Sequence, residues 1–443
     1  MKNQPLIDEA GAIAHEWQDD YDELLSIIGN AQYVLLGEMT HGTHEFYDIR
    51  AAISKKLIEE ENFHAIAVEA DWPDALRIHR YIQGSSKDRA ATEALSEFKR
   101  FPQWMWRNAD ILDFVGWIRS YNENLKQDRD KIGFYGLDLY SLQGSIESVL
   151  QYLSRVDPEA AKRARYRYSC FDHLGEDPQA YGYAAEFNLG QKCEDEVIAQ
   201  LLDLRKRALE YAQMDGRVAS DEYFFAEQNA RVIKNAENYY RTMFRGHVSS
   251  WNLRDTHMME TLVELSTYLA STGIKEPRII VWAHNSHLGD ARATDVNKRG
   301  EINLGELVRE KFGNRSILIG FSTYSGTVTA ASDWDGPVER KRVRRSLPES
   351  YEAAFHELGM SRAMFVFRDR KHPLREMHRG HLQRAIGVIY RPQSEMLSHY
   401  FRAVLPDQFD VMLHIDQTRG VEPMEPTAEW HTGEAGETFP SGL

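Results

Sequence analysis

The sequence is poor in cysteine, in long apolar runs and in positive charge. Only two cysteines occur in 443 residues, Cys170 and Cys193, and both lie in charged sequence with a helical pattern. We therefore expect neither a disulfide framework nor a cysteine-based zinc site. No apolar run approaches the roughly 20 residues that span a bilayer, and the first 18 residues lack the apolar core of a signal peptide. These absences predict a chain without a membrane segment, in the reducing cytoplasm by default.

Positive charge is outweighed by negative charge. The chain has 53 Lys and Arg against 68 Asp and Glu, a formal net charge of −15. This balance argues against a general nucleic-acid binder. The densest basic run, Glu339–Arg345 (ERKRVRR), is best explained as a solvated loop. The expected partner is therefore a small molecule, and neither nucleic acid nor a membrane.

The motifs of several enzyme classes are also missing. There is no G-x-S-x-G elbow, which argues against a serine esterase. No G-x-x-x-x-G-K-[ST] is present, and no G-x-G-x-x-G at a strand–helix turn, so neither nucleotide nor dinucleotide binding is predicted. We expect no cofactor, and if the chain is a hydrolase we expect its nucleophile to be water.

What the sequence does contain is a repeated pattern of a short apolar run, a polar turn and a helical period. The clearest case is Tyr33–Leu36, which ends at Gly37-Glu38 and precedes apolar residues at helical spacing from Phe46 to Leu57. Comparable apolar runs lie at 64–68, 132–135, 278–282, 316–319 and 409–415. Such alternation predicts an α/β fold with a three-layer, mainly parallel sheet.

The pattern changes twice along the chain. Residues 143–270 contain helical windows and no convincing strand, which predicts an α-helical insertion, irregular at 165–177. Residues 322–400 are expected to form a smaller α+β domain, with strand-like runs at 327–331, 363–367 and 385–390. The α/β core would then comprise 1–142, 271–321 and 401–443. The tail after Val421 is expected to be loosely ordered.

Acids and imidazoles follow the predicted strands. Glu38, Glu69, Asp138, His284 and His287 each come at or just after the end of an apolar run. A single acid in such a place is usually a helix cap. Because the carboxyl ends of parallel strands meet at one edge of a sheet, we expect these side chains to gather there. Acids and imidazoles together favour acid–base chemistry.

His41 is the candidate general base, because an imidazole titrates near working pH and can take and return a proton. Its alternative role would be to cap the next helix, which Thr40 and Thr43 would do better. Glu38, three residues earlier, would hold one imidazole tautomer or share its proton, unless it only binds loop amides. His44 is expected to be exposed.

Arg50 would lie on the helix after this loop, beside the apolar stripe. We expect it to pair with Glu69 and to stabilise an oxyanion together with His284 and His287; a plain buried ion pair would explain it equally well. The His-x-x-His spacing also permits a second hypothesis, a zinc ion held by His41, both histidines and a carboxylate. Because no HExxH or Cys-x-x-Cys is present, we favour contacts with substrate over a metal.

In these motifs the chain resembles the erythromycin esterase family. The matching residues are Gly37-Glu38-x-Thr40-His41-Gly42 with Glu45 and Arg50, then Val68-Glu69, Arg241, Ser250-Trp251-Asn252-x-Arg254-Asp255, Met258, Trp282-Ala283-His284-Asn285-x-His287, and the run from Phe409 to Pro423 with His414-Ile415-Asp416 and Arg419.

The resemblance implies hydrolysis of a macrolactone ester without a covalent intermediate, with water activated by the histidine at His41. It also implies a site lined by Glu38, Arg50, Glu69, His284 and His287. Some members of this family carry labels tied to succinoglycan biosynthesis. A third hypothesis is therefore a non-enzymatic protein of polysaccharide or cell-envelope metabolism that retains the cleft.

Overall fold

The computed structural model describes residues 3–18, 20–127, 130–174, 178–186, 192–212, 216–244, 246–368 and 374–433. Contacts between Cα atoms divide the chain into two compact units. Unit 1 comprises residues 1–66, 78–133 and 276–443, and unit 2 comprises 67–77 and 134–275. Strands β3 (Ala65–Asp71) and β4 (Gly133–Asp138) and helix α4 (Trp72–Gln83) each contain residues of both units. The three-part division expected from the sequence stays a prediction.

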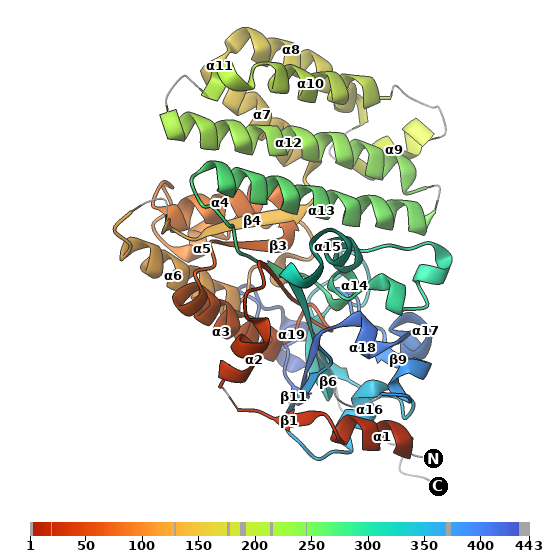
Figure 1. Cartoon of the computed structure of the whole chain (residues 1–443). Helices are drawn as coiled ribbons and strands as arrows, with labels where there is room; N and C mark the ends of the chain where they lie inside the picture. Colours follow the sequence, from red (N-terminus) through yellow and green to blue (C-terminus); the bar gives the residue numbers. More distant parts are fainter. Residues whose placement is uncertain are drawn as a thin grey trace. The chain divides into compact units, whose positions relative to one another are not determined.

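Unit 1 is built on a mixed sheet whose central strands are parallel (Figure 1). Its strand order is β1 (Ala14–Glu16), β8 (Arg362–Val366), β11 (Val411–Thr418), β6 (Ser316–Ala330), β2 (Tyr33–Leu36) and β5 (Ile279–Trp282). β2 is parallel to β5 and β6, and β11 is parallel to β6, whereas β8 and β1 are antiparallel to their neighbours. β7 (Glu339–Val343) pairs with the outer half of β6, and β9 (His381–Arg384) pairs with β10 (Tyr400–Ala403).

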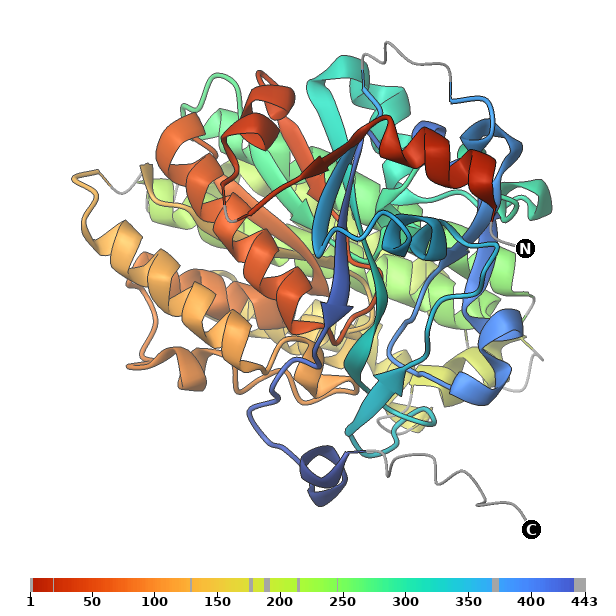
Figure 2. The same ribbon diagram turned by 90° about the horizontal axis from the view of Figure 1, so that it is seen from below.

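The middle of this sheet is apolar on both faces. Every residue of β2 and β5 is buried, as the continuous apolar runs predict for parallel strands covered on both sides. Helix α3 (His44–Glu61) buries its apolar stripe, and α6 (Ala109–Glu123) lies beside it (Figure 2). The other helices of unit 1 are α1 (Gln4–Gly11), α2 (Asp22–Ile28), α5 (Ala91–Ala94), α14 (Asn285–Leu288), α15 (Leu304–Phe312), α16 (Tyr351–His356), α17 (Glu395–Ser398), α18 (Leu405–Gln408) and α19 (Ala428–Thr432).

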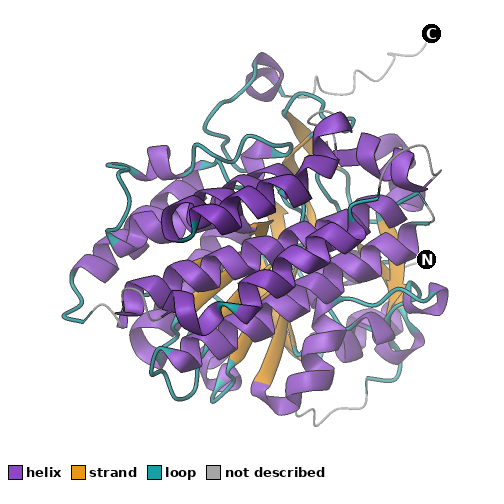
Figure 3. Cartoon of the chain, turned by 90° about the horizontal axis from the view of Figure 1, so that it is seen from above, coloured by secondary structure: helices purple, strands orange, loops and turns teal. Residues whose placement is uncertain are grey.

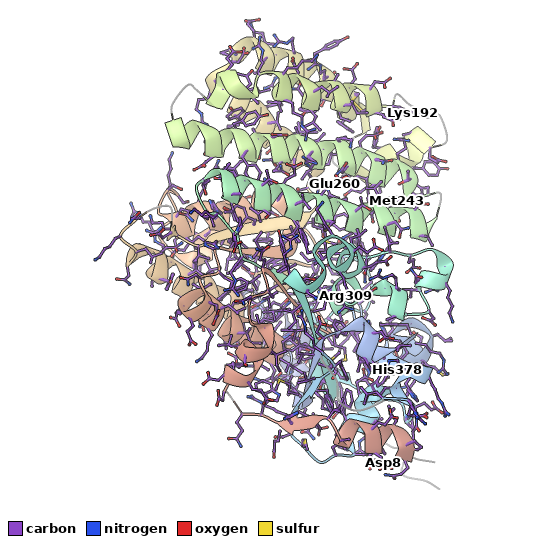
Figure 4. All side chains as sticks on the ribbon, viewed as in Figure 1. Asp8, Lys192, Met243, Glu260, Arg309 and His378 are labelled. Atoms are coloured by element: carbon purple, nitrogen blue, oxygen red, sulfur yellow. A yellow bond between two sulfur atoms is a disulfide. The ribbon has the colours of Figure 1, made fainter. Side chains whose placement is uncertain are left out.

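Ion pairs brace the end of the sheet at which β6 and β11 begin. Arg309, labelled in Figure 4, extends from α15 to the Oδ2 atoms of Asp290 (3.4 Å) and Asp410 (3.1 Å). Asp410 Oδ2 also accepts the backbone N–H of Leu318 at 2.8 Å. The start of β11 is therefore held to β6 by side chains as well as by the ladder.

From Leu139 to Lys275, the described residues of unit 2 are helical and contain no strand. The helices are α7 (Leu142–Val156), α8 (Pro158–Tyr168), α9 (Pro178–Glu186), α10 (Glu194–Lys206), α11 (Ala208–Ala212), α12 (Gly216–Thr242) and α13 (His247–Ser271). α12 packs against α7, α9, α10 and α13, which Figures 1 and 3 show side by side. A common apolar core, with Val149, Val197 and Ile233 fully or almost fully buried, joins helices α7 to α12.

The predicted fold class is confirmed, and several local predictions are wrong. Residues 385–390 are not a strand, because β9 ends at Arg384 and only isolated bridges follow. The basic run is strand β7, in which Lys341 is buried and lies 3.5 Å from Glu339. The stretch 165–177, expected to be irregular, is helical as far as Leu174, in α8 and in the 3-10 helix Ser169–Leu174. Residues 175–177 lie outside the described residues. The tail forms α19 before the described residues end at 433.

The two cysteines are joined. Cys170 and Cys193 form a disulfide, although their positions in the sequence gave no reason to expect one. Cys170 lies in the 3-10 helix after α8 and Cys193 directly precedes α10, and α8 packs against α10. The spacing of the two cysteines in the sequence does not reveal this packing. Among the described residues, no helix has the length and hydropathy needed to cross a bilayer.

Gly42 permits the closest backbone approach in the loop after β2. A Cβ atom on Gly42 would lie 1.8 Å from the carbonyl oxygen of Thr329. We predict that Gly42→Ala lowers the free energy of unfolding by about 1–3 kcal/mol or more, because the backbones must separate. Urea unfolding followed by circular dichroism measures this. Gly116→Ala in α6, where no atom lies within 4 Å, is the control and should be neutral or stabilising. Equal stability of Gly42→Ala and wild type would contradict the prediction.

Candidate active site

The loop from Gly37 to Thr43 is fixed by backbone hydrogen bonds on every side. Gly37 N–H donates to Ile319 O (2.8 Å), and the carbonyl oxygen of Glu38 accepts from Asn285 N–H (2.8 Å). The Gly42 carbonyl accepts two N–H groups, those of Thr329 and Val421, both at 2.9 Å. The loop is therefore held by strand β6, by the start of α14 and by the segment after β11. It cannot shift without breaking several of these bonds.

A histidine, a glutamate and an arginine form a chain in this loop and the helix after it. His41 Nδ1 lies 2.9 Å from Glu38 Oε1, and Arg50 Nη2 lies 2.5 Å from Glu38 Oε2. A carboxylate only accepts hydrogen bonds, so Nδ1 carries a proton, and in the neutral imidazole Nε2 keeps a lone pair. In the described part of the chain, Nε2 has no hydrogen-bond partner. The His41 side chain is 9% exposed, against 1% for Glu38 and for Arg50.

Aromatic rings enclose the arginine. The Arg50 guanidinium lies 4.6 Å from the ring centroid of Tyr47 and 4.8 Å from that of Trp282. Its Nε donates to Phe46 O at 3.2 Å. These contacts hold the guanidinium in place beside the Glu38 carboxylate. The expected pair of Arg50 with Glu69 is wrong, because Glu38 is the carboxylate paired with Arg50.

Tyr47 holds the loop from the helix side. Its hydroxyl lies 2.7 Å from the carbonyl oxygen of His41 and 2.9 Å from that of Met105. Burial, with a smaller contribution from the Glu38 charge, raises the pKa of Tyr47 well above its usual value. The hydroxyl therefore stays protonated and able to donate. Nothing in the sequence singled out Tyr47 beyond its place one turn before Arg50.

His284 comes to His41 from the end of β5. The two ring centroids are 4.8 Å apart and tilted by 41°. His284 Nδ1 accepts the backbone N–H of Ser286 (3.2 Å), so Nε2 carries the proton and donates to Met39 O (3.0 Å). The sequence predicted that the loop after β2 meets the residues after β5, and His284 makes this contact with His41. His287 is buried on α14, one helical turn further on.

Two acids gather in unit 2, where Glu69 lies inside β3 and Asp138 is the last residue of β4. Arg254 on α13 donates to Glu69 Oε1 and to Asp138 Oδ2, both at 2.6 Å, and its guanidinium lies 5.0 Å from the Tyr140 ring. Burial alone would raise the pKa of Asp138, but the charge and hydrogen bonds of Arg254 outweigh it and lower that pKa. Nothing in the sequence identified Arg254 as their partner, because the family resemblance included it only as a matching residue.

A further histidine is bound at the start of α3. His44 Nδ1 lies 2.9 Å from Asp110 Oδ2, and its Nε2 lies 2.7 Å from Arg419 Nη2. The hydrogen bond to Asp110 raises the pKa of His44 against the effect of burial. His44 is half-buried, so the expectation of an exposed side chain is wrong. Its partners are 66 and 375 positions away in the sequence, which no local pattern reveals.

The family model of erythromycin esterase matches residues 58–418. The chain belongs to the erythromycin esterase family. The match begins after Glu38, His41 and Arg50, so it does not include them. Erythromycin esterase type II of Escherichia coli is 22% identical over 372 residues, covering 79% of this chain and 84% of that protein. The putative hydrolase YbfO of Bacillus subtilis (strain 168) is 22% identical over 320 residues, covering 70% and 69%.

Solved structures share this family fold. A structure described as a succinoglycan biosynthesis protein is similar with a TM-score of 0.74 and 22% identity, over 95% of this chain and 98% of that chain. A mutant of the erythromycin esterase EreC in its open conformation gives a TM-score of 0.67 and 17% identity, over 92% and 96%. Among the described residues, no group of three or more His, Cys, Asp or Glu side chains is arranged to hold a metal ion.

The arginine of unit 2 has a testable energetic role. Arg254→Met removes the cation between two buried carboxylates, so we predict a loss of about 3–5 kcal/mol in unfolding free energy at pH 7. The folded pKa of Asp138 lies below its usual 3.8, so its stabilising contribution is present above that pH and is lost below it. The difference between variant and wild type should therefore shrink as the pH falls through about 4.

Urea unfolding at several pH values measures this difference. Arg155→Met is the control, because Arg155 is 62% exposed and its pair with Glu222 should contribute less than about 1 kcal/mol at any pH. A difference for Arg254→Met that is independent of pH would contradict the assignment.

Proposed function

We propose that this chain is a carboxylic-ester hydrolase in which His41 activates water and no covalent intermediate forms. The observation that carries the proposal is the Glu38–His41 hydrogen bond of 2.9 Å, with Nε2 of His41 unbound by any described residue. The membership of the family and the hydrolase relatives support a hydrolytic reaction. A macrolide lactone is one substrate to test, because two of the relatives are named erythromycin esterases.

The proton path follows from the tautomer. Nε2 of His41 takes a proton from water as the water oxygen attacks the ester carbonyl carbon. Glu38 stabilises the imidazolium that forms, by keeping its oxygen on Nδ1–H. When the tetrahedral intermediate collapses, the bond from carbonyl carbon to ester oxygen breaks. The imidazolium then returns its proton to that oxygen, giving an acid and an alcohol.

The neighbouring residues position this pair. Arg50 is enclosed and already bound to Glu38, so we assign it to holding the carboxylate. Its predicted contact with an oxyanion is replaced by this positioning role. His284 donates to the loop carbonyl of Met39 and keeps the loop beside β5. His287, buried on α14, remains a candidate for substrate contact, whereas Glu69 is paired with Arg254 within unit 2.

Removal of the imidazole should abolish most turnover. We predict that His41→Ala lowers kcat/KM by about 10²–10⁴-fold, the usual contribution of a general base. The assay uses p-nitrophenyl butyrate and a lactone panel that includes erythromycin, with thermal unfolding to verify the fold. His15→Ala is the control, because His15 lies on edge strand β1 with its side chain 51% exposed. Near-normal turnover of His41→Ala, or turnover lost on chelation and restored by a metal, would reject the proposal.

The carboxylate can be changed without changing its shape. In Glu38→Gln the amide oxygen should face the Arg50 cation, which leaves the amide NH₂ to donate to Nδ1 of His41. The imidazole proton then moves to Nε2 and the base is lost. We predict a fall in kcat of about 10²–10⁴-fold with little change in KM.

Nitrogen NMR of His41 reports the tautomer directly. Protonation at Nε2 in Glu38→Gln, and at Nδ1 in wild type, is expected. Glu23→Gln, at a side chain that is 56% exposed, should change neither activity nor the His41 signal. Wild-type kcat in Glu38→Gln would remove the carboxylate from the mechanism.

A further inference from the structure

Unit 1 contains a cavity that the proposed chemistry does not use. Its volume is about 350 Å³, within the range of small-molecule sites. Three segments line it: the loop around Phe101, the turn after β6 and the stretch between β11 and α19. The lining residues that matter here are Lys99, Phe101, Gln103, Trp104, Asp335 and Glu425.

Phe101 and Trp104 line this cavity, and Trp334, which precedes the lining residue Asp335, packs on Phe101. The ring of Phe101 meets that of Trp334 edge-on, with centroids 5.0 Å apart. Trp334 is 54% exposed, an unusual position for so large an apolar side chain. Trp104 is buried, and its Nε1–H has no acceptor among the described residues. Burying an indole N–H without an acceptor is costly, so an oxygen atom of a ligand at this wall would stabilise it.

Polar groups accompany the aromatic rings. Asp335 carries a carboxylate with no partner among the described residues, and it takes a left-handed backbone conformation at φ 57°. A residue other than glycine in that conformation costs free energy, and such positions concentrate at binding sites. Gln103 donates to Lys99 O at 2.6 Å, which leaves its amide oxygen to accept. Arg107 and Glu425 form an ion pair that holds the third segment in place.

The charges select the kind of ligand. Lys99 lies 3.0 Å from Glu97, so its charge is compensated, and two carboxylates line the cavity. An anion is therefore disfavoured, and a purely apolar ligand would cover the exposed Asp335 carboxylate and remove it from water without a hydrogen bond in return. A ligand with apolar ring faces and hydroxyl groups at its edge satisfies both the rings and the polar groups.

The cavity is connected to the catalytic loop by short paths. Met105, next to Trp104, lies 2.9 Å from the hydroxyl of Tyr47 that also contacts His41 O. Val421, which precedes the lining residue Pro423 by two positions, donates to Gly42 O at 2.9 Å. Both walls are thus anchored on rigid parts of unit 1, as a preformed binding site requires.

We propose that this cavity binds a neutral saccharide, with a pyranose face against Phe101 and Trp334 and ring hydroxyls on Asp335 and Gln103. Vicinal hydroxyls donate to a carboxylate, and a sugar oxygen accepts from Trp104. The proposal does not depend on His41 or on ester hydrolysis. A proline-rich peptide is the other occupant that an aromatic wall suits, and the carboxylates argue against it.

The test is equilibrium binding to the full chain. Isothermal titration with cellotetraose, maltotetraose, xylotetraose and chitotetraose, each measured separately, is expected to detect binding of at least one. Trp334→Ala and Asp335→Asn should each weaken that binding by about tenfold or more. Trp104→Phe, which keeps the ring and removes only the N–H, should weaken it as well.

Matched controls separate binding from folding. Tyr166→Ala removes an aromatic side chain that is 79% exposed on α8 of unit 2, and it should leave the affinity unchanged. His41→Ala should also bind the saccharide as wild type does, which makes failure here distinct from failure of the hydrolase. Three outcomes would overturn the proposal: no binding of any of the four tetrasaccharides, equal affinity in wild type and all three cavity variants, or binding of decaproline in their place.

Discussion

The buried pair between Arg50 and Glu38 is the constraint on which the rest of the site depends. A guanidinium and a carboxylate removed from water are tolerated only when their geometry and hydrogen bonds are good. The aromatic rings of Tyr47 and Trp282 supply that environment on two sides of the arginine. Because one carboxylate oxygen is committed to Arg50, the other is left to hold His41. The imidazole orientation is therefore set by residues that do not touch water themselves.

The sheet brings the side chains of the site together around this pair. β2 brings Glu38 and His41 to its carboxyl end, and the neighbouring parallel strand β5 ends at His284. Asn285, in the turn after β5, ties the two sides because its backbone N–H donates to the carbonyl oxygen of Glu38 at 2.8 Å. In parallel sheets, ligand-binding crevices commonly form at the carboxyl ends of the strands. In unit 1, this accounts for the meeting of a histidine at position 41 with one at position 284.

The sequence was informative wherever the signal was local. The apolar run Tyr33–Leu36 and the helical spacing after Phe46 fixed a strand, a loop and a helix, and so placed Glu38 and His41. Partners across the fold were not predictable in this way. Arg50 was assigned to the wrong carboxylate, because each glutamate comes just after an apolar run and nothing local shows that β3 continues past Glu69 to Asp71. Lys341 was placed in a solvated loop, because a charged strand on an outer ladder has the composition of a loop.

The disulfide between Cys170 and Cys193 has a chemical consequence for the whole chain. These are the only two cysteines in the sequence, so the oxidised protein has no free thiol. The oxidised protein therefore cannot transfer an acyl group through a cysteine thioester. Alkylating reagents such as iodoacetamide have no sulfhydryl group to modify. Reduction would create two such groups at once, both in the helical unit.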